Sequence, residues 1–435
     1  MVLRMKMPVV LGSILLFTVG ACQIKAQTQS PSPSPAVFAH YMPWFKAETG
    51  PDGSYTWEHW QWFGKGKKHD PDRILENGRR DIASVYYPKI GPYDGRDPSV
   101  LEYHLLTAKA AGIEGFIADW YGPDTYSDQV FSAMVKAAER YGMKVAICLE
   151  EKSFFPGYAP VKTRADVQAE MKRQMQYVLN THVQSPAYLQ HRGSPVFLVF
   201  NGYGETAVGV QTLSPQELSE VLSAFTNPAV LFLRLYYDPN FDGMGLGSYL
   251  WCTEAKSRKH YYGTSGAARD ENRIVFTMGV ANPGFDDSGV NGWGNGPRFT
   301  DRRGTGEYED NWNDALHFQP DAVQIATWND FEEGTTIEPS EEYGFSFLDL
   351  TEEFVGKFRG RPVQLSDNAL PLRLYRLRQI VASVADEETR QFWSERLDTY
   401  AGAFSRGTRF LMNWKLKRLE SKIQPLASDT KGEDS

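Results

Sequence analysis

Short apolar runs alternate with longer stretches of helical periodicity from residue 37 onward. Eight runs are rich in β-branched and aromatic residues, and several are apolar without alternation, which is typical of strands covered on both faces by helices. The predicted strands are 37–41, 82–87, 115–120, 144–150, 195–201, 230–236, 274–280 and 322–329. The predicted helices are 71–80, 98–111, 127–141, 163–181, 214–225, 249–262, 306–318 and 349–359.

Eight strands, each followed by a helix, predict an α/β fold of the (β/α)8 TIM-barrel type. We expect the barrel to occupy residues 37–360. An α/β layout with an open sheet fits the same periodicity and remains the alternative. Residues 361–423 are strongly helical and predict an extension that packs on the barrel, and residues 424–435 read as a polar tail. Residues 283–305 form a long loop of Gly, Asp and Asn after the seventh strand, and loops of that length are usually functional.

The N-terminal segment does not share this pattern. Residues 1–21 combine basic residues with a short apolar run, which predicts an export signal. The run ends in small residues directly before Cys22, which resembles a bacterial lipoprotein signal and implies lipidation of that cysteine. A secretory signal cleaved near Ala26 is the alternative. Residues 22–36 are rich in Gln, Ser and Pro and predict an extended tether. We therefore expect an exported lipoprotein of the cell envelope, at the outer membrane and facing the periplasm or the exterior.

Composition narrows the function classes. The chain has 435 residues and a formal net charge of -8, and this negative charge argues against electrostatic binding to nucleic acid. Its three cysteines form neither a CxxC pair nor a Cys/His cluster, so we expect no metal site. No glycine-rich phosphate loop is present, and we expect no cofactor. Nothing implies an obligate protein partner, and membrane contact is expected through the lipid anchor only.

Polar and aromatic residues gather where the predicted strands end. Active sites of (β/α)8 barrels are built at the carboxyl ends of the strands. Aromatic faces stack on sugar rings, and amides and carboxylates hydrogen-bond sugar hydroxyls. The candidates for sugar binding are therefore Tyr41, Trp44, Asp119, Trp120, Tyr121, Glu150, Asn201 and Asn329.

The segment 328–339 carries the strongest candidate chemistry. Asp330 and Glu333 are three residues apart, and in a helical turn such residues face the same way. Two neighbouring carboxylates in a closed cleft have their pKa values pushed apart, so that one acts as an acid while the other stays ionised. Cleavage of a glycosidic bond requires that division of roles. Glu332 faces away from the pair in such a turn. An acidic, solvated loop is the alternative interpretation.

Together these segments resemble the glycoside hydrolase family 71/99-like proteins, which include α-1,3-glucanases and endo-acting α-mannosidases. The resemblance covers residues 36–345 and rests on the order and spacing of its pieces. These pieces are 38–42, 101–104, 112–121, 144–150, 282–287, 302–304 and 328–339.

The resemblance implies roles for individual residues. Glu333 matches the general acid or acid/base, and Asp330 occupies the position of the second catalytic carboxylate, where the mannosidases have Glu. Glu150 matches a residue that helps bind the reacting sugar, and Trp120 matches an aromatic platform. The chain mixes glucanase-like and mannosidase-like sequence in 328–339, so a retaining and an inverting mechanism both stay open.

We therefore predict a glycoside hydrolase that cleaves α-linked polysaccharide or oligosaccharide of the α-mannan or α-1,3-glucan type. The alternative is a catalytically silent, glycan-binding surface lipoprotein on the same barrel. The joint presence of Asp330, Glu333 and Glu150 speaks against it, because a pure binder needs no paired acid and base. An enzyme that acts on another linkage is a third possibility, since barrel folds support many chemistries.

Overall fold

The computed structural model describes residues 35–202, 204–227, 229–361, 367–407 and 411–426. The predicted export signal, Cys22, most of the predicted tether and most of the polar tail lie outside the described residues. Among the described helices, none combines the length and the apolar character needed to cross a membrane.

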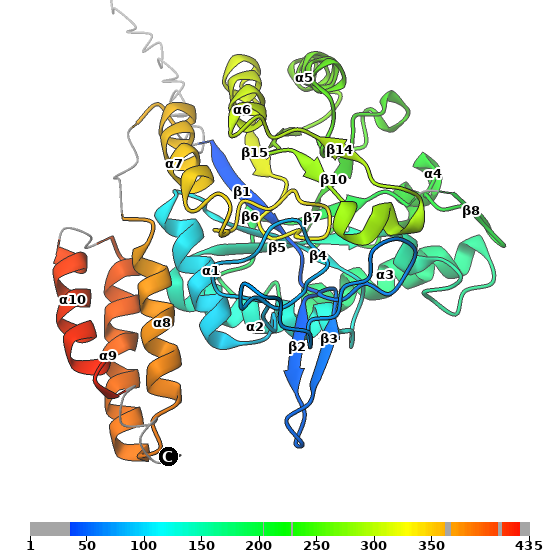
Figure 1. The fold of residues 1–435 in the computed structure, drawn as a ribbon. Coiled ribbons are helices and arrows are strands. Elements are labelled where there is room, and N and C mark those ends of the chain that lie inside the picture. The colour runs from blue at the N-terminus through cyan, green and yellow to red at the C-terminus, as the bar shows by residue number, and fades with distance from the viewer. Residues whose placement is uncertain (1–34, 203, 228, 362–366, 408–410, 427–435) are drawn as a thin grey trace, which may run out of the picture. The chain divides into compact units, whose positions relative to one another are not determined.

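Eight parallel strands form a closed barrel (Figure 1). Each strand pairs with the next along the chain, and the last pairs with the first. The strands are β1 (Ala36–Tyr41), β4 (Gly115–Trp120), β5 (Lys144–Glu150), β7 (Ser194–Phe200), β10 (Leu231–Leu235), β11 (Gly247–Tyr249), β12 (Phe276–Ala281) and β15 (Ala322–Ile325). The predicted (β/α)8 fold is confirmed, and the open-sheet alternative is excluded by the pairing that closes the ring.

Helices surround the barrel, and several begin where the sequence supplies a cap. Thr125, Thr163 and Ser214 each accept a hydrogen bond from a first-turn amide, and Gly142 ends a helix in the left-handed conformation. The helices are α1 (Pro98–Ala110), α2 (Tyr126–Tyr141), α3 (Arg164–Thr181), α4 (Pro215–Leu222), α5 (Ala255–Asp270), α6 (Gly306–Phe318) and α7 (Ser346–Phe358).

One predicted strand and one predicted helix are wrong. Residues 82–87 form bends, and their apolar character has another cause: Ile82 and Ala83 are buried in a loop, where the Ala83 amide donates to the Trp60 carbonyl. Residues 71–80 form turns instead of a helix. The missing strand is β11, which has three residues and is too short to show a period. Tyr249, where the predicted helix 249–262 starts, is the last residue of β11. The observed helix α5 (Ala255–Asp270) begins six residues later.

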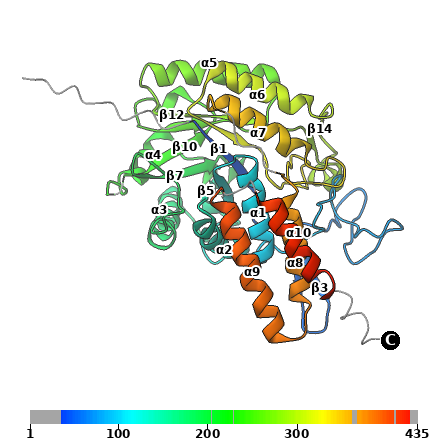
Figure 2. The same cartoon turned by 90° about the vertical axis from the view of Figure 1, so that its left-hand side faces the viewer.

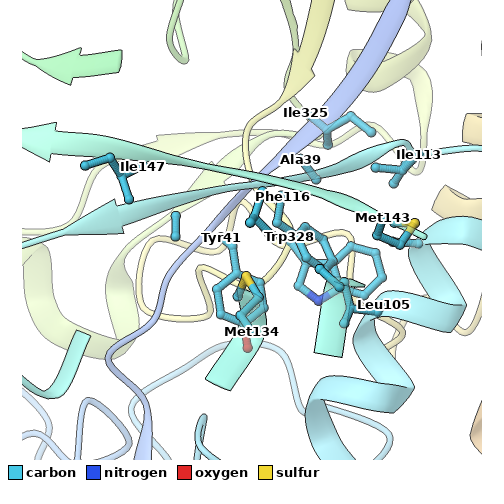
Figure 3. Packing of buried hydrophobic residues seen from close by; sticks show 14 of the residues in the cluster. Ala39, Tyr41, Leu105, Ile113, Phe116, Met134, Met143, Ile147, Ile325 and Trp328 are labelled. Atoms are coloured by element: carbon cyan, nitrogen blue, oxygen red, sulfur yellow. The ribbon is translucent and has the colours of Figure 1, made fainter. Parts of the chain in front are cut away.

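Strand alternation separates two of the three core clusters. One fills the barrel and includes Phe38, Ile117 and Cys148, and the other lies between the barrel and its helices. Figure 3 shows Tyr41 and Trp328 among side chains of the outer cluster. The parity of a strand position therefore decides whether its side chain points inward or toward a helix.

Three further helices form the extension expected after the barrel (Figure 2). They are α8 (Leu370–Ala382), α9 (Glu387–Ser405) and α10 (Met412–Ile423), and they contact α1 and α2. Arg378 of α8 donates to Glu102 of α1 and to Asp398 of α9, which joins the extension to the barrel layer.

Short elements lie in the loops between strands and helices. They are β2 (Lys46–Thr49), β3 (Tyr55–Glu58), η1 (Glu151–Phe154), β6 (Gln190–His191), β8 (Glu205–Thr206), β9 (Gly209–Val210), η2 (Pro239–Phe241), β13 (Phe285–Asp286), η3 (Ser288–Gly294) and β14 (Phe299–Thr300). Most follow the carboxyl ends of strands, and η1, β13, η3 and β14 contribute residues to the cleft described below.

Candidate active site

A cleft of about 740 Å3 opens at the carboxyl ends of the barrel strands. Residues at or after the carboxyl ends of β1, β4, β5, β7, β11, β12 and β15 line it. Four predicted sugar-binding residues are on its wall: Trp44, Asp119, Tyr121 and Glu150. Both predicted catalytic carboxylates, Asp330 and Glu333, line the same cleft. A volume of this size suits a small-molecule or oligosaccharide site.

Strand alternation explains why two of the other four candidates, Trp120 and Tyr41, are elsewhere. Trp120 follows the inward-facing Asp119 on β4 and therefore points outward, where its indole Nε1 donates to Asp128 at 3.1 Å. It is fully buried and lies parallel to the Tyr177 ring, so it cannot be the aromatic platform that the resemblance implied. Tyr41 also points outward from β1, and its hydroxyl lies 3.1 Å from the His104 ring.

Asn329 and Asn201 support the backbone around the cleft. The Asn329 side chain accepts from the Met42 amide at 2.7 Å and donates to the Met42 carbonyl at 3.0 Å. It thereby ties the loop after β15 to the end of β1. The Asn201 amide donates to the Leu235 carbonyl at 3.1 Å. Neither side chain is on the cleft wall, because these hydrogen bonds hold both in the scaffold.

The acid-bearing loop, residues 327–338, folds into a tight turn directly after β15. The Thr327 hydroxyl accepts from the Asp330 amide at 2.9 Å, and the Asp330 carboxylate accepts from the Glu333 amide at 2.9 Å. The Thr335 amide then donates to the Asp330 carbonyl at 3.1 Å. These bonds hold both carboxyl groups toward the cleft, as the three-residue spacing predicts.

Arg302 anchors the acid-bearing loop from behind. Its guanidinium donates to the carbonyls of Gly334 and Thr336, both at 2.8 Å, and lies over the rings of Tyr86 and Phe347. Gly334 has a φ of 58°, and a β carbon there would lie 2.7 Å from a backbone oxygen, so the turn requires glycine. Arg302 therefore fixes the loop instead of meeting the ligand.

The two carboxyl groups of the acid-bearing loop have unusual acidities. Burial raises the pKa of Asp330 well above its usual range, and the charge of Glu333 raises it further. Burial raises the pKa of Glu333 to about 7, although Arg298, 3.4 Å away, opposes the rise. Such a group carries a proton near neutral pH, which a general acid requires.

A second acidic pair comes from the ends of β4 and β5. Burial raises the pKa of Asp119 well above its usual range, and the neighbouring charge of Glu150 adds to the effect. Burial also raises the pKa of Glu150, but Lys152 opposes the rise at 3.4 Å from its carboxylate. Burial thus favours the neutral form of Asp119, while Glu150 is paired with a cation. The Lys152 ammonium also lies over the Tyr121 ring, which places this charge on the cleft wall.

Glu332 is turned away from the cleft, as the spacing predicts. Its carboxylate lies 2.8 Å from Nδ1 of His59, and it is absent from the cleft lining. The His59 ring stacks on Trp44, so Glu332 positions an aromatic wall indirectly.

The long loop after β12 supplies a further wall of the cleft. Trp293, Arg298 and Phe299 from this loop line the cleft. The Asp287 carboxylate accepts hydrogen bonds from the Arg298 backbone amide at 2.6 Å and from the Arg298 side chain at 2.7 Å. The ring of Trp293 meets that of Trp62 edge-on at 5.9 Å, which joins this loop to the one after β3.

Other cleft residues were missed from the sequence, because loops remote along the chain bring them together. Lys152 directly follows Glu150 and Glu151, and this neighbouring opposite charge was the one sequence signal that could have placed Lys152 at the cleft. The missed lining residues are His40, Met42, Lys152, Phe200, Cys252, Thr253, Glu254, Ala255, Thr300 and Glu307.

One buried cluster beneath the cleft carries metal-ligating groups. The ligand atoms of His40, Asp119 and Cys148 lie within 4.8 Å of one another. Burial lowers the pKa of His40 to about 4 and raises that of the Cys148 thiol, so both are neutral. A thiol must lose its proton to bind a metal, and burial opposes that loss. The cluster therefore fits the barrel core better than a metal centre.

Comparisons with known proteins agree with the predicted barrel. The model of glycosyl hydrolase family 99 matches residues 35–224 and ends before the acid-bearing loop. A Danio rerio glycoprotein endo-alpha-1,2-mannosidase-like protein is 27% identical over 309 residues, and the match covers 63% of this chain and 62% of that protein. A Rattus norvegicus glycoprotein endo-alpha-1,2-mannosidase is 25% identical over 328 residues, covering 69% and 67%.

The fold also has a solved counterpart. The GH99 endo-alpha-mannosidase from Bacteroides thetaiotaomicron aligns with a TM-score of 0.58 and 20% identity, over 74% of this chain and 97% of that one. This likeness concerns the barrel itself. The sequence matches, in turn, agree with the predicted resemblance to glycoside hydrolase family 71/99-like proteins.

Proposed function

We propose that the protein is a glycoside hydrolase that acts on glycans containing α-linked mannose. The observation that carries the proposal is the acid-bearing loop, which directs Asp330 and Glu333 into one cleft. The similarity to endo-alpha-1,2-mannosidases supports mannose as the sugar. The experiment below also tests α-1,3-glucan, the other predicted substrate.

In the proposed mechanism Glu333 is the general acid. Because its pKa is raised to about 7, it is protonated at and below neutral pH and can donate that proton to the departing glycosidic oxygen. A neutral Glu333 also removes the largest like charge acting on Asp330. Asp330 then ionises more readily and serves as the base, either toward water or toward a sugar hydroxyl.

The rest of the cleft would bind the sugar. Glu150 accepts hydrogen bonds from hydroxyls, while Lys152 keeps its charge compensated. Trp44, Tyr121 and Trp293 offer aromatic faces to the rings of the glycan. These groups come from three different loops, so they can contact more than one sugar unit.

We also propose that the enzyme is exported and anchored through a lipid on Cys22. The support is the signal-like segment before this residue and the Pro-rich tether after it. Labelling cells with a radioactive fatty acid tests the anchor, since Cys22→Ser would remove the label from the protein.

Product release from a panel of glycans tests the activity. The panel contains an α-mannan, an α-1,3-glucan and a mixed plant glycan, and the proteins are the native chain, Glu333→Gln and Glu388→Gln. Glu388 is an exposed carboxylate on α9, so its variant makes the same chemical change far from the cleft. We expect cleavage of α-mannan by the native protein and Glu388→Gln, and a loss of about 10²-fold to 10⁴-fold in Glu333→Gln.

Other outcomes would change the proposal. Cleavage of α-1,3-glucan instead of α-mannan would move the substrate to the glucanase type. Glycan binding without cleavage by any of the three proteins would replace the enzyme with a glycan-binding protein. The anomer of the first product would decide between retention and inversion.

A further inference from the structure

A second hollow opens at the same end of the barrel as the cleft. Its volume is about 630 Å3, and its walls are the loop between β7 and α4, the loop after β10 and the start of α3. Val210, Thr212 and Asn240 are among its lining residues. None of its lining residues belongs to the lining of the cleft, so the two hollows are separate.

Arg234 lies at the inner wall of this hollow. It occupies β10 between the inward-facing Leu233 and Leu235, so its side chain leaves the barrel outward. The residue is only 7% exposed and lines the hollow. Its guanidinium carbon lies 3.5 Å from the centre of the Phe241 ring. The side chain is therefore held in place by stacking.

The guanidinium of Arg234 has no hydrogen-bond acceptor among the residues the structure describes. Its Nε is shielded from solvent and has no partner there, and no carboxylate of the described part lies within 4.0 Å of its nitrogens. A buried arginine normally hydrogen-bonds a carboxylate or carbonyl oxygens, because burial of an unpaired charge is costly. Arg234 therefore lines the hollow with N–H donors that no described protein group satisfies.

The acidic groups around Arg234 are occupied by other donors. Glu217 accepts two hydrogen bonds from Arg164, and Asp238 accepts from the amide and the side chain of Asn240. Behind the hollow, Glu151 accepts from the Leu213 amide at 2.8 Å and from a threonine hydroxyl at 2.9 Å. Burial also lowers the pKa of Arg234 despite these charges, so its positive charge is incompletely compensated.

We propose that this hollow is a binding site for an oxyanion carried by a sugar, with Arg234 as its anchor. The planar guanidinium presents parallel N–H donors that match a carboxylate or a phosphate. Phe241 holds the fork from one side, and the polar lining offers contacts to the sugar that carries the charge. The site goes beyond the proposed hydrolysis, because it recognises an acidic substituent outside the cleft.

Direct binding tests the site independently of catalysis. The probes are glucuronate, mannose 6-phosphate and uncharged mannose, titrated into the intact protein and followed by ligand-observed NMR. We expect the two anionic sugars to bind and mannose to bind at least about tenfold more weakly. The tighter of the two anions would identify the carboxylate or the phosphate as the natural substituent.

Three variants locate the binding. Arg234→Met keeps an unbranched apolar stem over Phe241 and removes the fork, and Val210→Trp fills the hollow from a position that is 51% exposed. We expect each to weaken binding of the anions by about tenfold or more. Arg192→Gln changes an exposed arginine outside the hollow and should bind as the native protein does.

The proposal is overturned if Arg234→Met and Val210→Trp bind the anions as tightly as the native protein. Equal binding of mannose and the anions, or no binding of either anion, also overturns it. If Arg234→Met fails to fold by circular dichroism, Val210→Trp carries the test alone. A protein that cleaves no glycan can still bind the anions, so failure of the proposed hydrolysis and failure of this site are distinguishable.

Discussion

The cleft contains two acidic pairs that are built in different ways. Asp330 and Glu333 belong to one turn, three residues apart, whereas Asp119 and Glu150 come from neighbouring strands and are thirty-one positions apart. The Glu333 side chain is 23% exposed and faces an arginine that is itself largely exposed. The Glu150 side chain is 7% exposed and is paired with Lys152.

This difference separates proton transfer from binding. A carboxyl group that reaches the open part of the cleft, with a pKa raised to about 7, can exchange its proton with a substrate. A buried acid such as Asp119, whose neutral form is favoured by burial and which lies beside a paired carboxylate, is suited to holding hydroxyl groups. The same residue types therefore take different roles because exposure and the neighbouring cation differ.

The largest expected effect comes from matched amide substitutions in the two pairs. Asp330→Asn cannot ionise, so we expect kcat to fall by about 10²-fold to 10⁴-fold. Asp119→Asn resembles the neutral acid that burial already favours, so we expect a fall below about tenfold. Steady-state kinetics on α-mannan measures both. Equal losses in the two variants would remove the distinction between the pairs.

Removal of the cation from the second pair should affect binding more than chemistry. Lys152→Met leaves Glu150 buried without its counter-charge, so the pKa of Glu150 rises and its carboxylate accepts hydroxyls less well. We expect KM to rise by about three- to tenfold, equivalent to about 0.7–1.4 kcal/mol, with kcat nearly unchanged. A fall in kcat at unchanged KM would assign Lys152 to the chemical step instead.

The pH profile sharpens the role of the first pair. In the native protein the rate should fall as the pH rises through about 7, because Glu333 loses the proton that it donates. Arg298 lowers that pKa, so Arg298→Gln should raise it and move the falling limb to higher pH. If the pKa of Glu333 rises by half a unit, the rate at pH values above this pKa should increase about threefold. A limb that moves to lower pH would contradict the assignment of Glu333.

The smallest effect is expected at Glu332, the third acid of the same loop. Its carboxylate is buried against His59 and does not line the cleft. Glu332→Gln can still hydrogen-bond this ring, so we expect kcat within about twofold of native and an unfolding free energy within about 1 kcal/mol. Kinetics and denaturant unfolding measure the two quantities. A loss of activity as large as that of Asp330→Asn would contradict the assignment of Glu332 to a position outside the catalytic site.

Most of the barrel was predictable because its strands are apolar on both faces. Runs such as Gly115–Trp120 and Lys144–Glu150 were predicted with their observed bounds. β11 was not, because three residues carry no period and its strand pairing is supplied by β10 and β12. Residues 82–87 have the composition of a strand, yet their burial comes from a loop that packs on Trp60.

Some residues of the candidate site were likewise predictable from the sequence, and others were not. Asp330 and Glu333 were found because a three-residue spacing has a local geometric meaning. Trp120 and Tyr41 were assigned to the cleft by their place at strand ends, although alternation from the inward-facing Asp119 and His40 directs them toward the helices. That alternation was a usable signal in the sequence. No sequence signal indicated that Arg298 would meet Glu333, because the contact depends on the path of a long loop.

The sequence by itself determined seven of the eight barrel strands, the position of the acidic turn and the absence of local metal and phosphate motifs. These properties depend on neighbours within a few residues, so spacing and composition carry them. Only the tertiary structure decided which carboxyl group is exposed, which cation faces it, and that Arg234 is buried without an acceptor among the described residues. Burial and distance between remote loops arise when the barrel closes, and they set the pKa values on which the proposed chemistry depends.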